Sequence, residues 1–245
     1  MRQLKRRPAL PRRAGNKLAS QKASLMASLS PANICEQRFD GARQRKWFCP
    51  IRDALKDMAG DSGTCMFCDH NEPTDVEHFR PKTHFPGRTF SWGNMLWVCT
   101  TCNRMKGAYF PPHNCVGAAL IDPTIENVWD FFFLDQFGNL VKCWDVSRGA
   151  YNARSQSTCD YMYVDREEIQ TRRLKRLKGL KRSVEQAINE FQNGNGDVQS
   201  LSVQVNQWLA EPFQADVADY FFRGPGKTEK PFCDLIALGV TISMP

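Results

Sequence analysis

Two Cys-x-x-Cys pairs constrain the fold of this chain more than any other feature. "CMFC" contains Cys65 and Cys68, and "CTTC" contains Cys99 and Cys102, with thirty residues between the pairs. Two such pairs can supply four thiolates to one tetrahedral zinc ion. We therefore predict a structural Zn²⁺ that holds the two ends of the intervening loop together. The loop exceeds the spacing of a simple DNA-reading zinc finger, so we expect it to contain structure of its own.

The remaining cysteines and the apolar runs indicate the compartment. Ten cysteines are many for a reducing compartment, where disulfides rarely persist and clustered cysteines more often bind metal. The longest apolar runs, such as "FFFL" at 131–134, are far shorter than a membrane span, and the amino terminus lacks the apolar run of a secretory signal. We expect a cytoplasmic protein without a membrane segment. The six isolated cysteines are predicted to be ordinary buried thiols: Cys35, Cys49, Cys115, Cys143, Cys159 and Cys233.

The net charge of +7 is concentrated near the amino terminus. Eight of the 33 lysines and arginines lie in the first 22 residues, which contain no acid, so the remaining 25 nearly balance the 26 acids. A second basic cluster, "RRLKRLKGLKR" at 172–182, has leucines at helical spacing and predicts an amphipathic helix with a cationic outer face. A solvated helix surface and a phosphate-contacting surface are equally good interpretations of this cluster.

Turn residues divide the chain into three expected segments. Together the strands and helices expected in these segments predict an α+β fold. Residues 1–60 are a basic amino-terminal arm, mobile or loosely docked over its first thirty residues, and a helix over much of 36–59. Residues 61–125 are the zinc-pinned core. Residues 126–245 are a hairpin through "DQFGN" followed by helices at about 160–192 and 197–210. The zinc-pinned core is thus embedded in a mainly helical chain.

The content of the zinc-closed loop predicts two strands and a helix. "TDVEHFRP" can form one strand, "GRTFSWGNMLWV" can return as the second, and the residues after Cys99 can begin a short helix. His78 on the first strand and Asn103 at the helix start then face each other across a small gap. The two strands and the helix would surround a second metal position.

These residues carry a family resemblance. "CMFC", "DVEHFRPK", "WGNMLWVCTTCNRMKG" and "LIDP" together resemble the HNH nuclease superfamily, whose core is the ββα-metal fold. They are also similar to the HNH proteins of Septu-type anti-phage systems, the PtuB-like family, which accompany some retrons as well. The match covers residues 65–123. It implies a metal-dependent endonuclease that hydrolyses phosphodiester bonds of DNA, as the effector of an anti-phage defence complex with a partner ATPase of the ABC or SMC-like (PtuA-like) type.

The resemblance also implies roles for individual residues. His78 matches the general base that removes a proton from the attacking water. Glu77 and Asn103 match the pair that holds a divalent cation, Mg²⁺ or Mn²⁺, against the scissile phosphate. Asn94 matches the residue that braces the loop bearing the histidine. Many HNH proteins have histidine where this chain has Asn103, which leaves the metal preference open.

The chemistry agrees with these roles independently of the family. A phosphodiester repels hydroxide, so a cation must neutralise the phosphate and the leaving oxygen. The oxygen donors of Glu77 and Asn103 suit hard Mg²⁺, whereas thiolates suit zinc. His78 can act as a base near neutral pH, although a histidine in a folded core is more commonly structural.

Three cations and one glycine-rich motif have weaker functional claims. Arg80, Lys82 and Lys106 are candidates for contacts with adjacent phosphates, and ordinary surface charge explains each of them equally well. "GPGKT" at 224–228 resembles the end of a phosphate-binding loop, but Phe221 stands where that motif needs glycine. We therefore expect no nucleotide site there.

Two other functions use the same residues. One is an effector that cleaves RNA, such as a tRNA nuclease. The other is a non-catalytic zinc module that binds nucleic acid or a partner protein. Replacing His78 separates the nuclease interpretations from the binding module, and only the substrate separates DNA from RNA cleavage.

Overall fold

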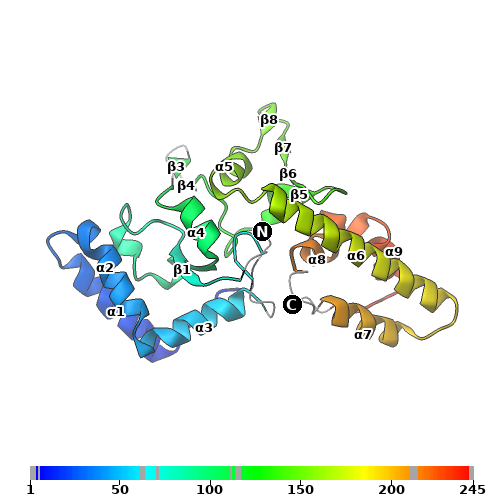
Figure 1. Ribbon diagram of the computed structural model, residues 1–245, viewed down its shortest axis with the longest axis horizontal. Helices are drawn as coiled ribbons and strands as arrows, with labels where there is room; N and C mark the ends of the chain where they lie inside the picture. Colours follow the sequence, from blue (N-terminus) through cyan, green and yellow to red (C-terminus); the bar gives the residue numbers. More distant parts are fainter. Residues whose placement is uncertain are drawn as a thin grey trace.

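The computed structural model describes residue 4 and residues 6–60, 64–69, 72–110, 112–113, 117–209 and 215–242. Over this part the chain combines helices with short two-stranded antiparallel sheets, an α+β arrangement (Figure 1). The amino-terminal helices lie at one end of the long axis and the carboxy-terminal helices at the other, with the strands between them.

Most of the amino-terminal third is helical, and its first helix packs against the core, which corrects the expectation of a mobile arm. Helix α1 (Arg12–Met26) buries Ala14, Leu18 and Leu25 on one face. These three positions share one side of a helix, so the segment has an apolar stripe despite its many cations. The single helix expected over 36–59 is two helices, α2 (Pro31–Arg43) and α3 (Cys49–Met58), separated by a short 3-10 turn.

The residues before α1 form a strap across the central segment. The Leu4 amide donates to the Pro123 carbonyl at 3.2 Å. The Arg7 guanidinium donates to the carbonyls of Trp92 and Met95, at 2.9 and 3.0 Å, and lies 4.8 Å from the centre of the Trp92 ring. The basic character of this segment therefore serves internal hydrogen bonding at Arg7.

The central segment contains the two strands and the helix that the sequence predicts, but both strands are shorter than the predicted stretches, and 3-10 turns occupy 86–88 and 92–94. Strand β1 (Asp75–His78) pairs antiparallel with β2 (Met95–Val98), with His78 opposite Met95 and Glu77 opposite Leu96. Helix α4 (Thr100–Lys106) follows β2 directly and ends at Gly107, whose φ of +49° favours glycine. The next pair, β3 (Pro112–His113) and β4 (Gly117–Ala118), is short.

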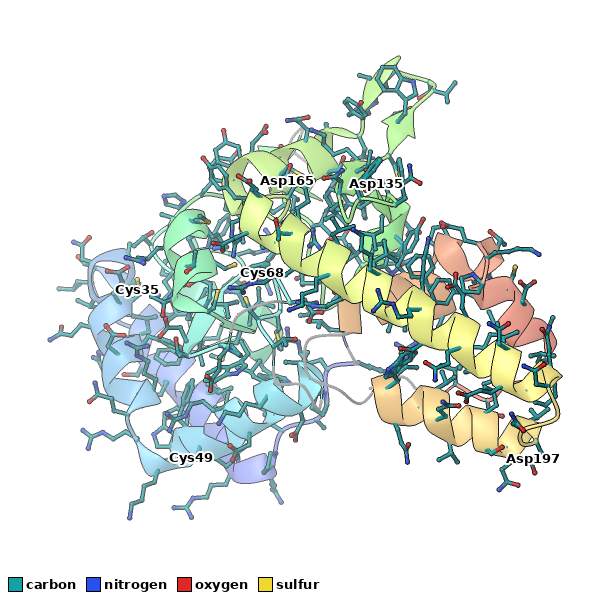
Figure 2. The ribbon with its side chains drawn as sticks, turned by 45° about the vertical axis from the view of Figure 1, so that its right-hand side comes forward. Cys35, Cys49, Cys68, Asp135, Asp165 and Asp197 are labelled. Atoms are coloured by element: carbon teal, nitrogen blue, oxygen red, sulfur yellow. The ribbon has the colours of Figure 1, made fainter. Side chains whose placement is uncertain are left out.

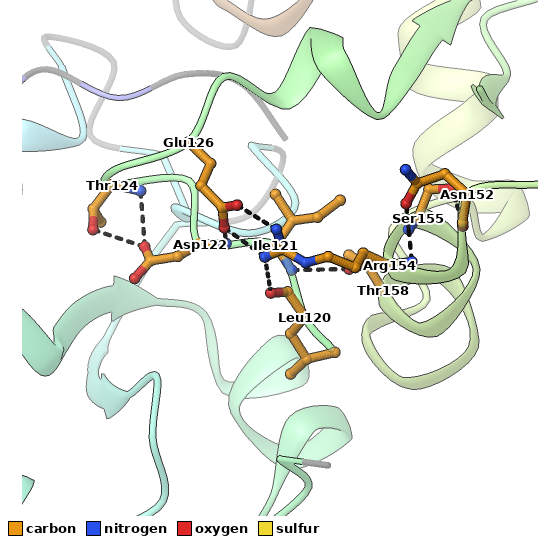
Figure 3. A network of polar contacts seen from close by, with 9 residues as sticks. All are labelled: Leu120, Ile121, Asp122, Thr124, Glu126, Asn152, Arg154, Ser155 and Thr158. Atoms are coloured by element: carbon orange, nitrogen blue, oxygen red, sulfur yellow. Dashed lines mark hydrogen bonds and ion pairs between the residues drawn. The ribbon is translucent and has the colours of Figure 1, made fainter. Parts of the chain in front are cut away.

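Two further hairpins follow, and a polar network joins them to the rest. Strands β5 (Phe132–Leu134) and β6 (Leu140–Lys142) form the hairpin expected through "DQFGN", and β7 (Trp144–Asp145) pairs with β8 (Ala150–Tyr151). Arg154, just after β8, donates to Glu126 at 2.7 Å and to the Leu120 carbonyl at 2.8 Å (Figure 3). This network ties the "LIDP" loop to helix α5 (Ala153–Met162).

Helices fill the carboxy-terminal part. Helix α6 (Glu167–Gln192) is the longest of those described, and α7 (Val198–Leu209), α8 (Ala215–Phe222) and α9 (Phe232–Ala237) pack around it (Figure 1). Residues 225–228 of the "GPGKT" motif form a 3-10 turn instead of a phosphate loop. A Cβ at Gly226 would lie 2.5 Å from the Tyr220 ring, so this glycine serves tight packing.

One cluster of buried apolar side chains extends from Leu4 to Leu235, and the three expected segments all contribute to it. The division at residues 60 and 125 stays a prediction. Among the described residues, no helix combines the length and the apolar character needed to cross a membrane. Of the isolated cysteines, Cys35 and Cys159 are buried, Cys49, Cys143 and Cys233 are half-buried, and Cys115 lies outside the described residues.

Candidate functional site

The four cysteines of the two Cys-x-x-Cys pairs converge in the interior. Their sulfur atoms all lie within 4.8 Å of one another, and all four residues are buried. The Cys68 and Cys99 sulfurs are 4.0 Å apart, close to the ~3.8 Å edge of a tetrahedron with Zn–S distances of about 2.3 Å. The separation is far too long for a disulfide. Four buried thiols at this spacing fit one structural zinc ion.

Local backbone geometry presents these sulfurs. The Asp69 amide donates to the Cys65 carbonyl at 2.8 Å, which closes the first Cys-x-x-Cys turn. In the second, Cys99 is the N-cap of α4 and its sulfur accepts from the Cys102 amide at 3.4 Å. Arg166, immediately before α6, places a guanidinium nitrogen 4.0 Å from the Cys102 sulfur. Figure 2 shows Cys68 beside the first turns of α6.

His78 is buried, yet its side chain borders a cavity. The residue is 1% exposed, and its Nε2 lies 2.7 Å from the Thr89 carbonyl oxygen. A carbonyl only accepts hydrogen bonds, so Nε2 carries the proton and Nδ1 is the unprotonated nitrogen. Nδ1 is itself buried and has no hydrogen-bond partner among the described residues. The ring of Phe39 packs edge-on against the imidazole at 4.4 Å.

The surroundings of His78 keep the imidazole neutral. Burial, with smaller contributions from Lys82 and Lys106, lowers the pKa of His78 to about 3. Removing an imidazolium from water is unfavourable, and the neighbouring cations repel it further. The ring is therefore a neutral acceptor at physiological pH.

Asn94 holds the loop that follows His78. Its side-chain oxygen accepts from the Arg80 amide at 2.8 Å, and its side-chain nitrogen donates to the carbonyls of Arg80 and Arg88, at 2.9 and 3.2 Å. Three hydrogen bonds from one buried amide thus connect the two ends of the 80–88 loop. The Phe79 amide donates to the Asn94 carbonyl at 2.9 Å and reinforces the connection.

Glu77 and Lys106 form a buried ion pair. The Lys106 Nζ lies 2.8 Å from a Glu77 carboxylate oxygen and donates to the His78 carbonyl at 2.7 Å. The Lys106 side chain is fully buried, and burial lowers its pKa although Glu77 opposes the shift. Lys106 is therefore neither a surface charge nor exposed to a phosphate, which corrects both sequence interpretations of this residue.

Asn103 belongs to the same helix as Lys106 but is half-buried. Its side-chain nitrogen donates to an Asp75 carboxylate oxygen at 3.3 Å. Asp75 precedes Glu77 by two residues on β1, so both carboxylates belong to one face of the strand. The Asn103 side-chain oxygen is therefore the ligand atom that this residue can offer to a cation.

A pocket of about 210 Å³ brings the predicted residues together. Glu77, His78, Lys82 and Asn103 all line it, and Glu36 from α2 contributes a further carboxylate. A carboxylate, an amide and an unpartnered buried imidazole nitrogen in one pocket fit a hard divalent cation next to a base. Glu77 and Asn103 are the residues that could hold it.

The two remaining cations differ in position. Lys82 lines the pocket and its Nζ lies 5.4 Å from the Phe39 ring centre. The Arg80 guanidinium instead stacks between Phe110 and Phe85, at 4.9 and 5.6 Å. Lys82 is thus the better candidate for a phosphate contact. Trp97 is buried and Trp92 is half-buried, and both pack in or against the apolar core.

Sequence reasoning missed three contributors to this site. Asp75 had a signal, because it lies two residues before Glu77 in a strand. Thr89 acts through its backbone carbonyl, which any residue type provides. Glu36 lies on a helix some forty residues earlier in the chain, and only the packing of α2 against the loop brings it to the pocket.

Comparisons with known proteins add one relative. No family model matches the chain. Over 120 residues the chain is 24% identical to Septu protein PtuB of Bacillus thuringiensis. The aligned region covers 47% of this chain and 41% of that protein, so the chain matches less than half of its relative's length. The chain resembles PtuB, in agreement with the resemblance that the motifs carry.

Proposed function

We propose that this protein is a metal-dependent HNH-type endonuclease that hydrolyses phosphodiester bonds of DNA as the effector of an anti-phage defence complex. The observation that carries the proposal is the buried His78 Nδ1, which has no partner among the described residues, on a residue that lines one pocket with Glu77 and Asn103. An unsatisfied buried acceptor is costly, so its presence calls for an explanation. Proton abstraction from a water molecule in the pocket provides one.

Each residue of the pocket would have a separate role in the reaction. The Thr89 carbonyl fixes the tautomer of His78 so that Nδ1 can take a proton from water. Asn94 holds the loop whose position determines where the imidazole points. A divalent cation bound by Glu77 and Asn103 would supply neutralisation of the phosphate and of the leaving oxygen. Lys82 would attract the phosphate into the pocket.

The low pKa of His78 bears on when the base becomes effective. A base with a pKa of about 3 is weak at neutral pH. An anionic phosphate in the pocket favours the imidazolium and raises that pKa. The phosphate would therefore make His78 a stronger base, against the opposing effect of a cation held by Glu77 and Asn103.

The resemblance to PtuB supports a role in Septu-type defence and a protein partner. We infer that the partner is an ATPase of the ABC or SMC-like type, PtuA-like, that controls cleavage. The "GPGKT" segment forms a 3-10 turn and not a nucleotide-binding loop, which agrees with an ATPase on a separate chain. The zinc thiolates are compatible with a reducing, cytoplasmic environment.

Replacing His78 tests the proposal. We expect His78→Ala to reduce cleavage of plasmid DNA with Mg²⁺ or Mn²⁺ by about 10² to 10⁴. Zinc content, measured by plasma mass spectrometry, should equal that of the wild type. His84→Ala is the matched control, because His84 is an exposed histidine of the same loop. The assays use the chain co-purified with the product of its neighbouring gene.

The outcomes separate the three functions. Loss of DNA cleavage in the His78 variant alone supports the proposal. Cleavage of tRNA or other RNA in place of DNA would assign the same site to an RNA-cleaving effector. Unchanged cleavage by the His78 variant would overturn the proposal, and binding without cleavage by the wild type would leave a zinc module that binds nucleic acid or protein.

A further inference from the structure

Helix α6 separates its basic residues into two groups with different surroundings. Seven of the eleven residues from 172 to 182 are lysine or arginine, and residues 169–184 contain no acid. Arg173 and Arg176 turn inward and pair with Asp216 of α8, each at 2.9 Å. The Lys181 Nζ lies 5.7 Å from the Phe221 ring centre. These three cations are used in packing the carboxy-terminal helices.

The other four cations form an exposed surface, which we call the α6 basic face: Arg172, Lys175, Lys178 and Arg182. At 100° per residue they lie within an arc of about 120°, opposite the buried Leu177, Leu180 and Val184. Within the described part of the chain, Lys175, Lys178 and Arg182 have no ion-pair partner. Their charge is therefore available to an external anion.

The length of the α6 basic face matches a nucleic-acid backbone. From Arg172 to Arg182 the helix rises about 15 Å. Successive phosphates of one strand in a duplex are about 3.4 Å apart along the axis, so the surface spans about four of them. A small acidic ligand would need only one or two of these cations.

The position of the α6 basic face relates it to the candidate site. Arg166, just before α6, contacts the sulfur of Cys102, which immediately precedes Asn103. The first exposed cation, Arg172, is about 9 Å further along the helix. From there α6 extends away from α4 (Figure 1). The α6 basic face thus begins close to the four-cysteine cluster, whose Cys102 is the neighbour of Asn103 in the chain.

We propose that the α6 basic face binds the phosphodiester backbone of duplex DNA outside the cleavage site. The choice of DNA rests on the proposed function. The surface itself rests on the separation of α6 cations into inward residues that pack against α8 and exposed outward ones, of which Lys175, Lys178 and Arg182 have no ion-pair partner among the described residues. It contributes affinity and orientation without reading sequence, because its contacts are to phosphates.

Charge removal on α6 tests this, with α1 as the matched control. The variant Lys175→Gln/Lys178→Gln/Arg182→Gln removes three exposed cations. The control Arg13→Gln/Lys17→Gln/Lys22→Gln removes three exposed cations from another helix. Binding of a fluorescent 30-base-pair DNA duplex is measured by anisotropy over a range of KCl concentrations without added Mg²⁺. Circular dichroism verifies that both variants are folded.

We expect the α6 variant to bind DNA about tenfold or more weakly, with a salt slope reduced by about 2 to 3, while the control stays near wild type. Equal losses in both variants would show a bulk charge effect and overturn the proposal. Unchanged DNA binding by the α6 variant, or a loss confined to an RNA duplex of the same length, would overturn it too. Because the assay measures binding alone, a failed His78 test leaves this result standing.

Discussion

At the scale of single residues, the Glu77 and Lys106 pair is the arrangement with the largest consequence for the site. Both side chains are almost completely buried, and Lys106 also holds the carbonyl of His78. Breaking a buried ion pair by removing one partner leaves the other charge uncompensated. The pair therefore positions a candidate metal ligand and the backbone of the candidate base together.

We predict that Lys106→Met lowers the free energy of unfolding by about 3 kcal/mol, because it strands the Glu77 carboxylate in the interior. Urea denaturation measures the loss. The double variant Glu77→Gln/Lys106→Met should be less destabilised than the sum of the single variants, since neither charge then remains. Lys82→Met, at a half-buried lysine of the same pocket, is the control and should change stability little. A Lys106 variant as stable as wild type would argue against the buried pair.

At the scale of elements, the turn between β5 and β6 packs against α6. Gly138 has a φ of +80°, and a Cβ there would lie 2.6 Å from the backbone nitrogen of Leu174. The turn between β7 and β8 contains Gly149 with a similar φ of +61° and nothing within 4 Å. The two glycines share a backbone conformation and differ only in what surrounds them.

This pair separates backbone strain from close packing. We expect Gly149→Ala to cost about 1 kcal/mol, the strain of a left-handed alanine. Gly138→Ala should cost about 3 kcal/mol, because the turn must also move away from α6. Thermal unfolding of both variants measures the difference. Equal losses would mean that the β5–β6 turn does not rest on the helix.

At the scale of the whole molecule, the four-cysteine cluster joins segments that are distant in the chain. Cys65 and Cys99 begin its two turns, β1 and β2 lie between them, and Arg166 reaches the cluster from the start of α6. In small units of this kind metal binding supplies folding free energy. Loss of the metal should therefore lower the stability of segments outside residues 65–107 as well.

We predict about one zinc ion per chain, which Cys99→Ser abolishes together with cooperative unfolding of the central segment. Cys49→Ser, at an isolated half-buried thiol, is the control and should keep both zinc and melting temperature. Zinc content by mass spectrometry and a thermal melt give the comparison. A soluble Cys99 variant with full zinc occupancy and normal melting would contradict the four-thiolate site.

What the sequence determined by itself was local. The Cys-x-x-Cys turns, a strand through His78, the helix after Cys99 and the hairpin through Gly138 depend on neighbours within a few residues, and all are present. That His78 and Asn103 face each other followed from the loop that the cysteines close, whereas the place of Glu77 beside them followed from the family resemblance.

Only the tertiary structure decided which side of each element faces inward. Charge suggested that α1 was a loose arm and that Lys106 was at the surface, yet α1 packs one apolar face against the core and Lys106 is buried. The same applies to α6, where Asp216 draws two arginines inward and leaves the others exposed. The sequence around a lysine or arginine does not reveal its partner, because burial depends on residues that the fold brings from elsewhere in the chain.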